Sequence, residues 1–273
     1  MGVCRVPRKT SYLKPKLKGL RNSRALLGIV FFIFALTAMG ESRIFSRVTV
    51  CIGNNAGNVE QRAGKLLLKR LEDLTGVDGE LCAGEEMPSA SPNGCLILLG
   101  VPARHHLLAQ TMEKEGIPPL TWLDPGPEGF VLKSIERPGL YLVCAAGLDD
   151  RACLYAVGEL LRQVNEDVEG KFQLPTLDRR AAPAFEWRGT QVCQSSTQLE
   201  RAHTRVRTPE ELEETMLNYV LAGANTFEVV TVDEVILLDR WGLKKRICLS
   251  GNGGSFSDHP EWTAKESIGR AGF

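Results

Sequence analysis

The side chains best suited to acid–base chemistry in this sequence are a few carboxylates near segments that are expected to form strands. Two positioned carboxylates can act as acid and base in a hydrolytic reaction. A carboxylate at a strand end is more often solvated or paired with a cation. We therefore assign no catalytic role to the four residues of this kind, Glu186, Glu228, Asp233 and Glu234.

The other candidate groups for chemistry are histidines and serines. Neither GxSxG nor an evident partner histidine accompanies Ser195 and Ser196, which argues against a serine hydrolase. The histidines do not share metal-ligand spacing with other ligands, so each is expected to be solvated and no metal site or cofactor is predicted. These histidines are His105 and His106, which form an exposed-looking pair at a helix start, and His203 and His259.

The eight cysteines are spread along the chain and form no CxxC motif. Cys51, Cys95 and Cys144 lie in apolar, strand-like runs, and Cys153 lies on one face of an expected helix. This placement favours buried small hydrophobic residues over disulfides, which typically staple smaller secreted scaffolds.

The first 40 residues have the composition of an export signal. Residues 1–24 contain eight basic side chains and no acidic one, and the charge-free apolar run "ALLGIVFFIFALTAMG" follows at 25–40. This run is short for a membrane span of about 20 residues, and its small residues suit cleavage after Gly40. We expect a protein exported to the periplasm or the extracellular space. A membrane anchor through residues 25–40 is the alternative, and the membrane is a partner only in that case.

Without this leader the chain holds 25 basic and 33 acidic residues, and the whole chain has no net charge. Neither balance is typical of a nucleic-acid-binding protein. Nucleic acid is therefore not expected as a partner.

Periodic apolar residues predict an α/β domain over residues 41–165. Strands are expected at 45–53 and 94–100, and a hairpin at 128–147. Apolar stripes predict one helix from Val59 that ends at Gly76, and another over about 150–165 that is capped by Asp149. A small sheet with two helices on one face would account for this pattern.

Residues 166–184 lose this periodicity and are expected to form a linker. The remaining segment, 185–273, begins with a strand at 185–192, a helix opened by the capping box of Thr208 and Glu211, and a strand at 225–230. This is a βαβ unit, which favours a parallel sheet or a barrel. Only about 40 residues follow, whereas a complete eight-stranded barrel takes about 250. We therefore expect the start of an incomplete (β/α)8 barrel.

Together these segments resemble the front of β-hexosaminidases and α-glucuronidases, in which a non-catalytic α/β domain precedes a (β/α)8 barrel. The matching stretches are "AGKLLLKRLEDLTG", "EGFVLKSI", "LYLVCAAGLDDRACLYAVGELL", "APAFEWRGTQV" and "LNYVLAGANTFEVV". The resemblance covers about residues 46–230. It implies a glycoside hydrolase-like protein whose partner is a carbohydrate, and whose catalytic carboxylates lie on barrel strands beyond those seen here.

The resemblance also implies a role for Arg188 in the "WRG" motif, as a ligand of sugar hydroxyls. A guanidinium suits this role because its planar fork offers several fixed donors. An arginine paired with a carboxylate is an equal alternative. We expect an exported carbohydrate-active protein that is inactive alone. The alternatives are a non-catalytic glycan- or protein-binding module of the cell envelope and a signal-anchored structural protein of the envelope.

Overall fold

The computed structural model describes residues 42–89, 91, 93–166, 170–191, 208–229 and 232–247. Within these ranges, no helix combines the length and the apolar character that a membrane crossing requires. The predicted signal segment lies outside the described residues, as do Ser195, Ser196, His203 and His259.

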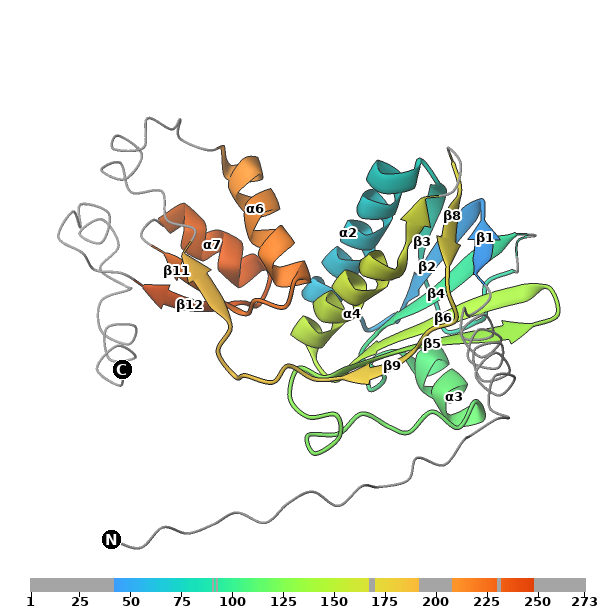
Figure 1. The fold of residues 1–273 in the computed structure, drawn as a ribbon. Coiled ribbons are helices and arrows are strands. Elements are labelled where there is room, and N and C mark those ends of the chain that lie inside the picture. The colour runs from blue at the N-terminus through green and yellow to red at the C-terminus, as the bar shows by residue number, and fades with distance from the viewer. Residues whose placement is uncertain are drawn as a thin grey trace, which may run out of the picture. The chain divides into compact units, whose positions relative to one another are not determined.

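A six-stranded sheet forms the centre of the N-terminal part, residues 42–181 (Figure 1). Its strands lie in the order β3–β2–β4–β6–β5–β9. The first four are parallel to one another, whereas β5 is antiparallel to both β6 and β9. The bounds are β2 (Arg47–Ile52), β3 (Asp78–Ala83), β4 (Gly94–Gly100), β5 (Phe130–Arg137), β6 (Leu140–Gly147) and β9 (Asp178–Ala181).

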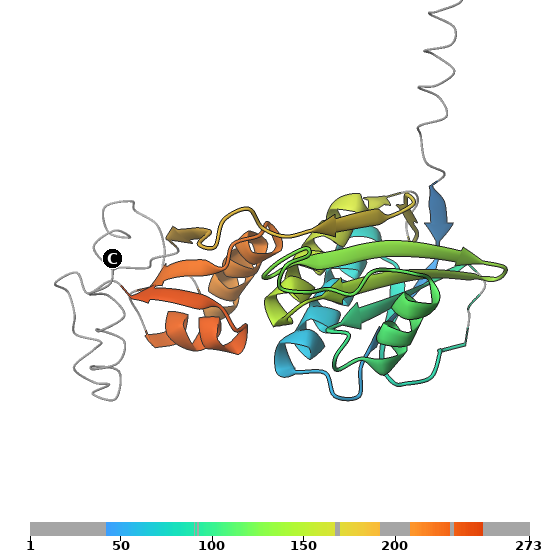
Figure 2. The ribbon, with the colours of Figure 1, turned by 90° about the horizontal axis from the view of Figure 1, so that it is seen from below.

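Helices cover both faces of this sheet. On one face α2 (Asn58–Thr75) and α4 (Asp150–Gln163) pack side by side, as expected, over alternate strand residues such as Val50, Ile97 and Val143. On the other face lies α3 (His106–Lys114), which buries Leu98 and Cys144 (Figure 2). A continuous apolar strand such as β4 needs cover on both faces, and α3 supplies the second cover.

The local signals for the two expected helices operate as predicted. Gly76 ends α2 in the left-handed conformation, with φ of 68°, which glycine adopts at no steric cost. The side chain of Asp149 accepts a hydrogen bond from the backbone N–H of Ala152 and so caps α4. The described part of the fold is therefore α/β, with two helices on one sheet face as predicted.

The segment expected as a linker contains strands. β8 (Phe172–Leu174) pairs with β1 (Arg43–Phe45) and β7 (Asn165–Glu166), and β9 forms the edge of the large sheet beside β5. Phe172 lies fully buried, and its ring packs at a tilt against that of Phe45, with 5.3 Å between the ring centroids. Short strands of two to four residues show no periodicity, so their pattern in the sequence resembles that of a loop.

The C-terminal part, residues 185–247, is a parallel βαβαβ unit. Its strands are β10 (Gly189–Gln191), β11 (Thr226–Val229) and β12 (Lys244–Ile247), in that order, and its helices are α6 (Pro209–Leu221) and α7 (Val232–Arg240). The capping box of Thr208 and Glu211 opens α6 as predicted. The first strand is shorter than the predicted 185–192, because residues 185–188 lie outside it. Helix α7 and the strand β12 that follows it were not predicted.

Candidate functional site

The principal candidate site is the interface at which the N-terminal part holds α6. Tyr155, Gly158 and Arg162 lie on one face of α4, three and four residues apart. The Tyr155 hydroxyl donates to the carbonyl of Ala224 at 3.3 Å, and Arg162 Nη1 donates to the carbonyl of Leu221 at 2.8 Å. Arg162 thereby satisfies one of the last carbonyls of α6, which have no partner within the helix.

Gly158 permits the close approach of the two helices. A Cβ atom at this position would lie 2.0 Å from the carbonyl oxygen of Leu221. Only a residue without a side chain fits there, because backbone atoms of α6 occupy the space. The end of α6 therefore rests directly on the backbone of α4.

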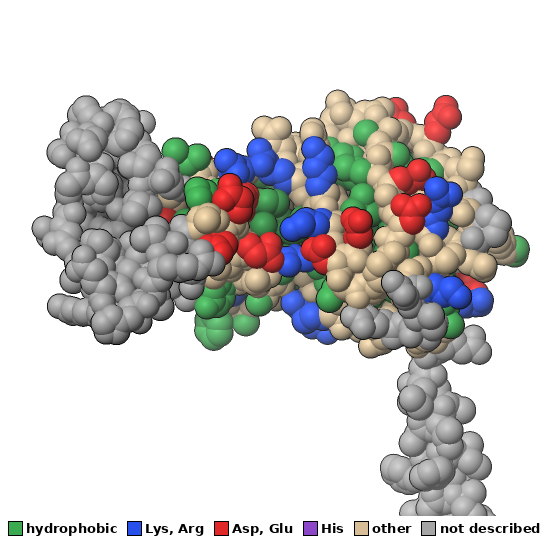
Figure 3. Space-filling view, turned by 90° about the horizontal axis from the view of Figure 1, so that it is seen from above, with side chains coloured by type: hydrophobic (Ala, Val, Ile, Leu, Met, Phe, Trp, Pro, Cys, Tyr) green, Lys and Arg blue, Asp and Glu red, His purple; other side chains and the backbone are tan. Residues whose placement is uncertain are grey.

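Helix α2 adds a polar contact to the same interface. Arg70 forms an ion pair with Glu214 at 2.5 Å and donates to Asn218 Oδ1 at 2.8 Å, both in α6. The guanidinium of Arg62 lies 6.0 Å from the ring centroid of Trp241, which follows α7. On the face shown in Figure 3, basic and acidic side chains lie interspersed over these helices. One apolar cluster continues across the interface, so the two described parts share a core.

A buried charge cluster fixes the start of β10. The Arg188 guanidinium pairs with Glu128 at 2.5 Å, donates to the Tyr155 hydroxyl at 3.0 Å and lies over the Tyr155 ring. Its Nε donates to the carbonyl of Gly223 at 2.6 Å. Asn225 Nδ2 also donates to Glu128, at 3.0 Å, so residues from both parts meet at one carboxylate.

Glu128 is the centre of this cluster. Its side chain is 7% exposed and also pairs with Arg151 at 2.6 Å. Its φ of 55° lies in the left-handed region, which residues other than glycine seldom adopt. Burial alone raises the pKa of Glu128, but hydrogen bonds from Arg188 and Asn225 and the positive charge of Arg151 outweigh burial and lower the pKa.

The stability of the chain should therefore depend on the protonation of Glu128. Because the pKa of this carboxyl is lowered in the folded chain, its contribution is present above its ordinary pKa of 4.5 and is lost as the pH falls further. We expect Glu128→Gln to reduce the difference in unfolding free energy between pH 6 and pH 3, measured by urea denaturation. Glu186→Gln is the matched control, because its side chain is 77% exposed. An equal reduction in both variants would contradict this assignment.

The structure places Arg188 at the amino end of β10, directly before Gly189. In barrels of this type the active site lies at the opposite, carboxyl end of the strands. Its side chain is 18% exposed, and its contacts fit the alternative of an arginine paired with a carboxylate. Sugar binding by Arg188 stays a prediction.

The other acidic residues considered from sequence belong to three different segments of the C-terminal part. Glu186 is exposed and lies 3.8 Å from Lys244, whereas Glu234 is buried in α7. Glu228 belongs to β11 and Asp233 to α7. Among the described residues, no three His, Cys, Asp or Glu side chains form a group that could hold a metal ion. All five described cysteines are unbridged, and four of them are buried, as expected.

The expectation of an exposed His105 was wrong. Its Nε2 lies 3.1 Å from the carbonyl oxygen of Cys51, and its Nδ1 accepts a hydrogen bond from the N–H of Leu108 at the start of α3. Burial lowers the pKa of His105, so the ring is neutral and has a structural role. His106, the next residue, is exposed as predicted. One histidine of the pair is thus buried and the other is exposed at the start of α3, a difference that the sequence alone did not reveal.

A second buried carboxylate lies at the carboxyl ends of β2 and β4, the end of the strands at which open α/β sheets commonly bind ligands. Glu60 accepts hydrogen bonds from the N–H of Gly57 at 2.6 Å, the N–H of Val101 at 2.7 Å and Arg104 Nε at 2.8 Å. Arg104 in turn pairs with Asp150. The donors around Glu60 and the pairing of Arg104 thus satisfy this carboxylate within the protein.

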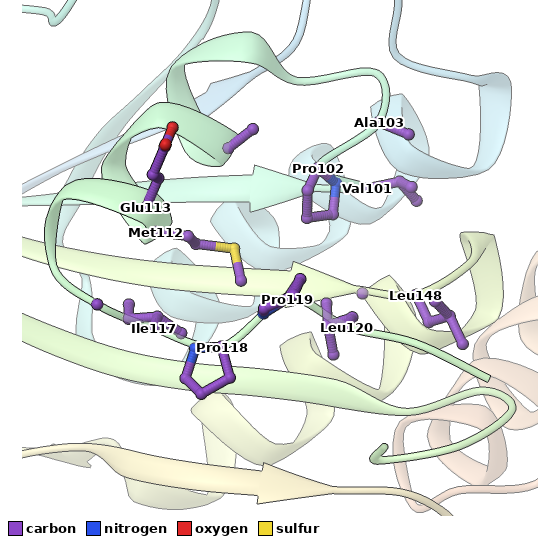
Figure 4. Close-up of a pocket in the computed structure, with 13 residues that line it drawn as sticks. Val101, Pro102, Ala103, Met112, Glu113, Ile117, Pro118, Pro119, Leu120 and Leu148 are labelled. Carbon is purple, nitrogen blue, oxygen red and sulfur yellow. The ribbon is translucent and has the colours of Figure 1, made fainter. Parts of the chain in front are cut away.

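An open pocket of about 540 Å³ begins at Val101, next in the chain to the end of β4 (Figure 4). Its wall is mainly apolar and comes from the end of β4, from α3, from residues 116–120 and from the end of β6. Met112, Pro119 and Leu120 point into it, and Glu113 lies at one end. Arg180 holds the loop by donating to the carbonyls of Pro118 and Pro119, at 3.0 and 2.7 Å.

Sequence reasoning did not identify Glu128, Tyr155 or Gly158 as interface residues. Glu128 opens the "EGF" stretch and Tyr155 and Gly158 lie in "LYAVGELL", the two stretches on which the resemblance chiefly rests. The available signal was Gly158, a glycine within a strong helical pattern. Glycine weakens a helix, so its presence there points to close packing against a neighbouring element.

No protein-family model and no curated protein matches this sequence. Among solved structures, a family GH115 4-O-methyl-α-glucuronidase with specificity for decorated arabinogalactans is similar, with a TM-score of 0.53 and 14% identity over 74% of this chain and 29% of that chain. A GH20 exo-β-N-acetylglucosaminidase from Vibrio harveyi has a TM-score of 0.44 and 15% identity, over 70% of this chain and 23% of that chain. A β-hexosaminidase from Streptomyces plicatus has a TM-score of 0.43 and 13% identity, over 70% of this chain and 32% of that chain.

The chain spans less than a third of the length of each of these enzymes. At this level of identity, the likeness to the α-glucuronidase concerns the fold alone. It confirms the predicted resemblance at that level: this chain has the fold of part of a glycoside hydrolase, an α/β region followed by barrel-type strands.

Proposed function

We propose that this chain is the exported, non-catalytic front of a carbohydrate-active protein of the glycoside hydrolase type. Its N-terminal part serves as a scaffold on which the first barrel strands are mounted. The observation that carries the proposal is the interface of α4 with α6, where Gly158 and Arg162 meet the carbonyl of Leu221. The Glu128–Arg188 pair fixes the start of β10 on the same scaffold.

The chemistry of the described residues supports a scaffold more than an enzyme. Three of the buried acids, Glu60, Glu128 and Glu159, are paired with arginines, which disfavours proton transfer from them to a substrate. Among the described acids of the C-terminal part, Glu186 is exposed beside Lys244, and Glu213 and Glu214 pair with Arg240 and Arg70. Within the described residues, the outer edges of the three-stranded parallel sheet pair with no other strand, and further barrel strands would cover such edges.

Activity and binding assays test this proposal. We expect the purified chain to release no sugar from a decorated arabinogalactan or from a β-N-acetylglucosaminide. We also expect residues 41–180 alone to show no retention on immobilised glycans. Hydrolysis by the chain, abolished when one of its own carboxylates is replaced, would contradict the proposal.

Export is tested separately, by the intact mass of the protein recovered from the cell envelope and the medium. We expect a chain that begins at Glu41. A mass that includes residues 1–40 would instead favour the anchor at 25–40.

The pocket beside α3 favours a second candidate function, a binding module. Its volume lies in the range of small-molecule sites, about 300–1,000 Å³, and Arg180 holds one wall in place. Retention of residues 41–180 on a glycan, lost when Ala109 in the pocket wall is replaced by phenylalanine, would favour this function over the scaffold alone.

A further inference from the structure

Two of the described cysteines are neighbours in the large sheet. The parallel register of β2 and β3 places Cys51 directly opposite Cys82. Residues opposite each other on adjacent parallel strands project to the same face of a sheet. In agreement, Cys82 packs against the apolar cluster under α3 that contains Cys51. The two thiols therefore lie side by side.

The two thiols differ in their exposure. Cys51 is fully buried, and burial followed by the hydrogen bond with the Cys82 thiol raises its pKa to about 12. Cys82 is only half-buried, at the margin of the cluster. A reagent in solution would therefore reach Cys82 first, and Cys51 would respond only to a group already attached to Cys82.

The backbone geometry is compatible with a bond between them. Neighbouring strands lie about 4.8 Å apart, and the Cα atoms of disulfides are usually about 4.4–6.8 Å apart. β3 is an edge strand whose only neighbour in the sheet is β2. It can move by the small amount that the bond requires, because no strand lies on its other side in the described sheet.

We propose that Cys51 and Cys82 form a reversible disulfide when the chain enters an oxidising compartment. This rests on the proposed function, because export would bring the chain to such a compartment. The oxidant is a disulfide, either a small molecule or a protein. The Cys82 thiolate attacks one sulfur of this disulfide and releases one thiol. Cys51 then loses its proton, attacks the Cys82 sulfur and releases the second thiol.

The bond would close the β2–α2–β3 unit and tie the edge strand to its neighbour. Cross-linking residues separated by about 30 positions restricts the unfolded chain, and strain in the sheet offsets part of this gain. We expect a rise in melting temperature of about 5 °C. The bond would thereby resist detachment of the edge strand β3 from β2.

The test is a glutathione titration of the full, folded chain, followed by acid quenching, alkylation and peptide mapping. Cleavage with trypsin and Glu-C isolates Cys82 between Glu80 and Glu85, apart from Cys95. We expect a cross-linked peptide that joins Cys51 to Cys82, with a loss of about 2 Da, in oxidising buffer and not in reducing buffer.

Variants show whether the rise in melting temperature belongs to this pair. Cys82→Ser should abolish the oxidation-dependent rise, whereas Cys144→Ser should retain it, because Cys144 lies in the same sheet opposite Leu98 and Lys133. Free thiols at both positions in oxidising buffer, or glutathione attached to Cys82 without an internal bond, would overturn the proposal. Neither result bears on export, which the mass of the N-terminus decides independently.

Discussion

Replacing Gly158 by alanine is expected to destabilise the chain by about 3 kcal/mol, as the upper range for overpacked sites suggests. The added methyl group would lie 2.0 Å from the carbonyl oxygen of Leu221, and this backbone atom can move only if α6 leaves α4. In an ordinary helix interior the same substitution stabilises by about 1 kcal/mol. A decrease in the unfolding free energy therefore indicates that Gly158 contacts α6, whereas an increase indicates that it faces open space. Urea denaturation followed by tryptophan fluorescence measures it.

Gly64 of α2 provides the matched control for this substitution. It is also a helical glycine, but the nearest atom to an added Cβ, at 2.9 Å, is the end of the flexible Leu81 side chain. We expect Gly64→Ala to change the unfolding free energy by less than about 1 kcal/mol, because gained helix propensity offsets a small rearrangement. Equal effects at both positions would show that α4 and α6 are not in the described contact.

Removal of the Arg188 charge should have a comparable effect. We expect Arg188→Met to cost about 3 kcal/mol, because it leaves the buried Glu128 carboxylate without one of its two arginines. Arg188→Lys should recover only part of this loss, since an ammonium group cannot reproduce the fork that contacts Glu128, Tyr155 and the carbonyl of Gly223.

A double-mutant cycle assigns the effect to the pair. In the Glu128→Gln background, Arg188→Met should cost less than in the original chain, with a coupling energy of about 2 kcal/mol. Unchanged stability in Arg188→Met, together with weaker carbohydrate binding, would instead support the role of a sugar ligand for Arg188. The same variants therefore separate the two alternatives that the sequence leaves equal.

The sequence predicts the parts of the fold whose signals are local. Three such signals each predict one element, and each element forms where expected. They are the helix stripe that ends at Gly76, the cap at Asp149 and the apolar run at 94–100. The edge strands β3 and β9 were missed because their exposed residues alternate poorly. Strand β3 is placed by pairing with β2, from which α2 separates it along the chain. Strand β9 is placed by pairing with β5, which is distant in sequence.

The candidate site was harder to predict, because its residues come together only in the folded chain. Glu128 precedes β5, Arg188 precedes β10 and Asn225 precedes β11, and no spacing rule relates these positions. Only Arg188 was identified from sequence, through the resemblance of the "WRG" motif. His105 was misjudged for the same reason: nothing in its neighbours along the chain reveals the carbonyl of Cys51 that lies within hydrogen-bond distance of its Nε2.

In the function proposed above, the N-terminal part acts as the scaffold for α6 and the first barrel strands. Native-state hydrogen exchange of the α6 amides in the unmodified chain tests it most directly. We predict that the interior amides of Pro209–Leu221 exchange only when the six-stranded sheet opens, with the same free energy as β4 and β6. Exchange of α6 through a separate, much lower-energy opening, while β4 and β6 stay protected, would contradict the claim.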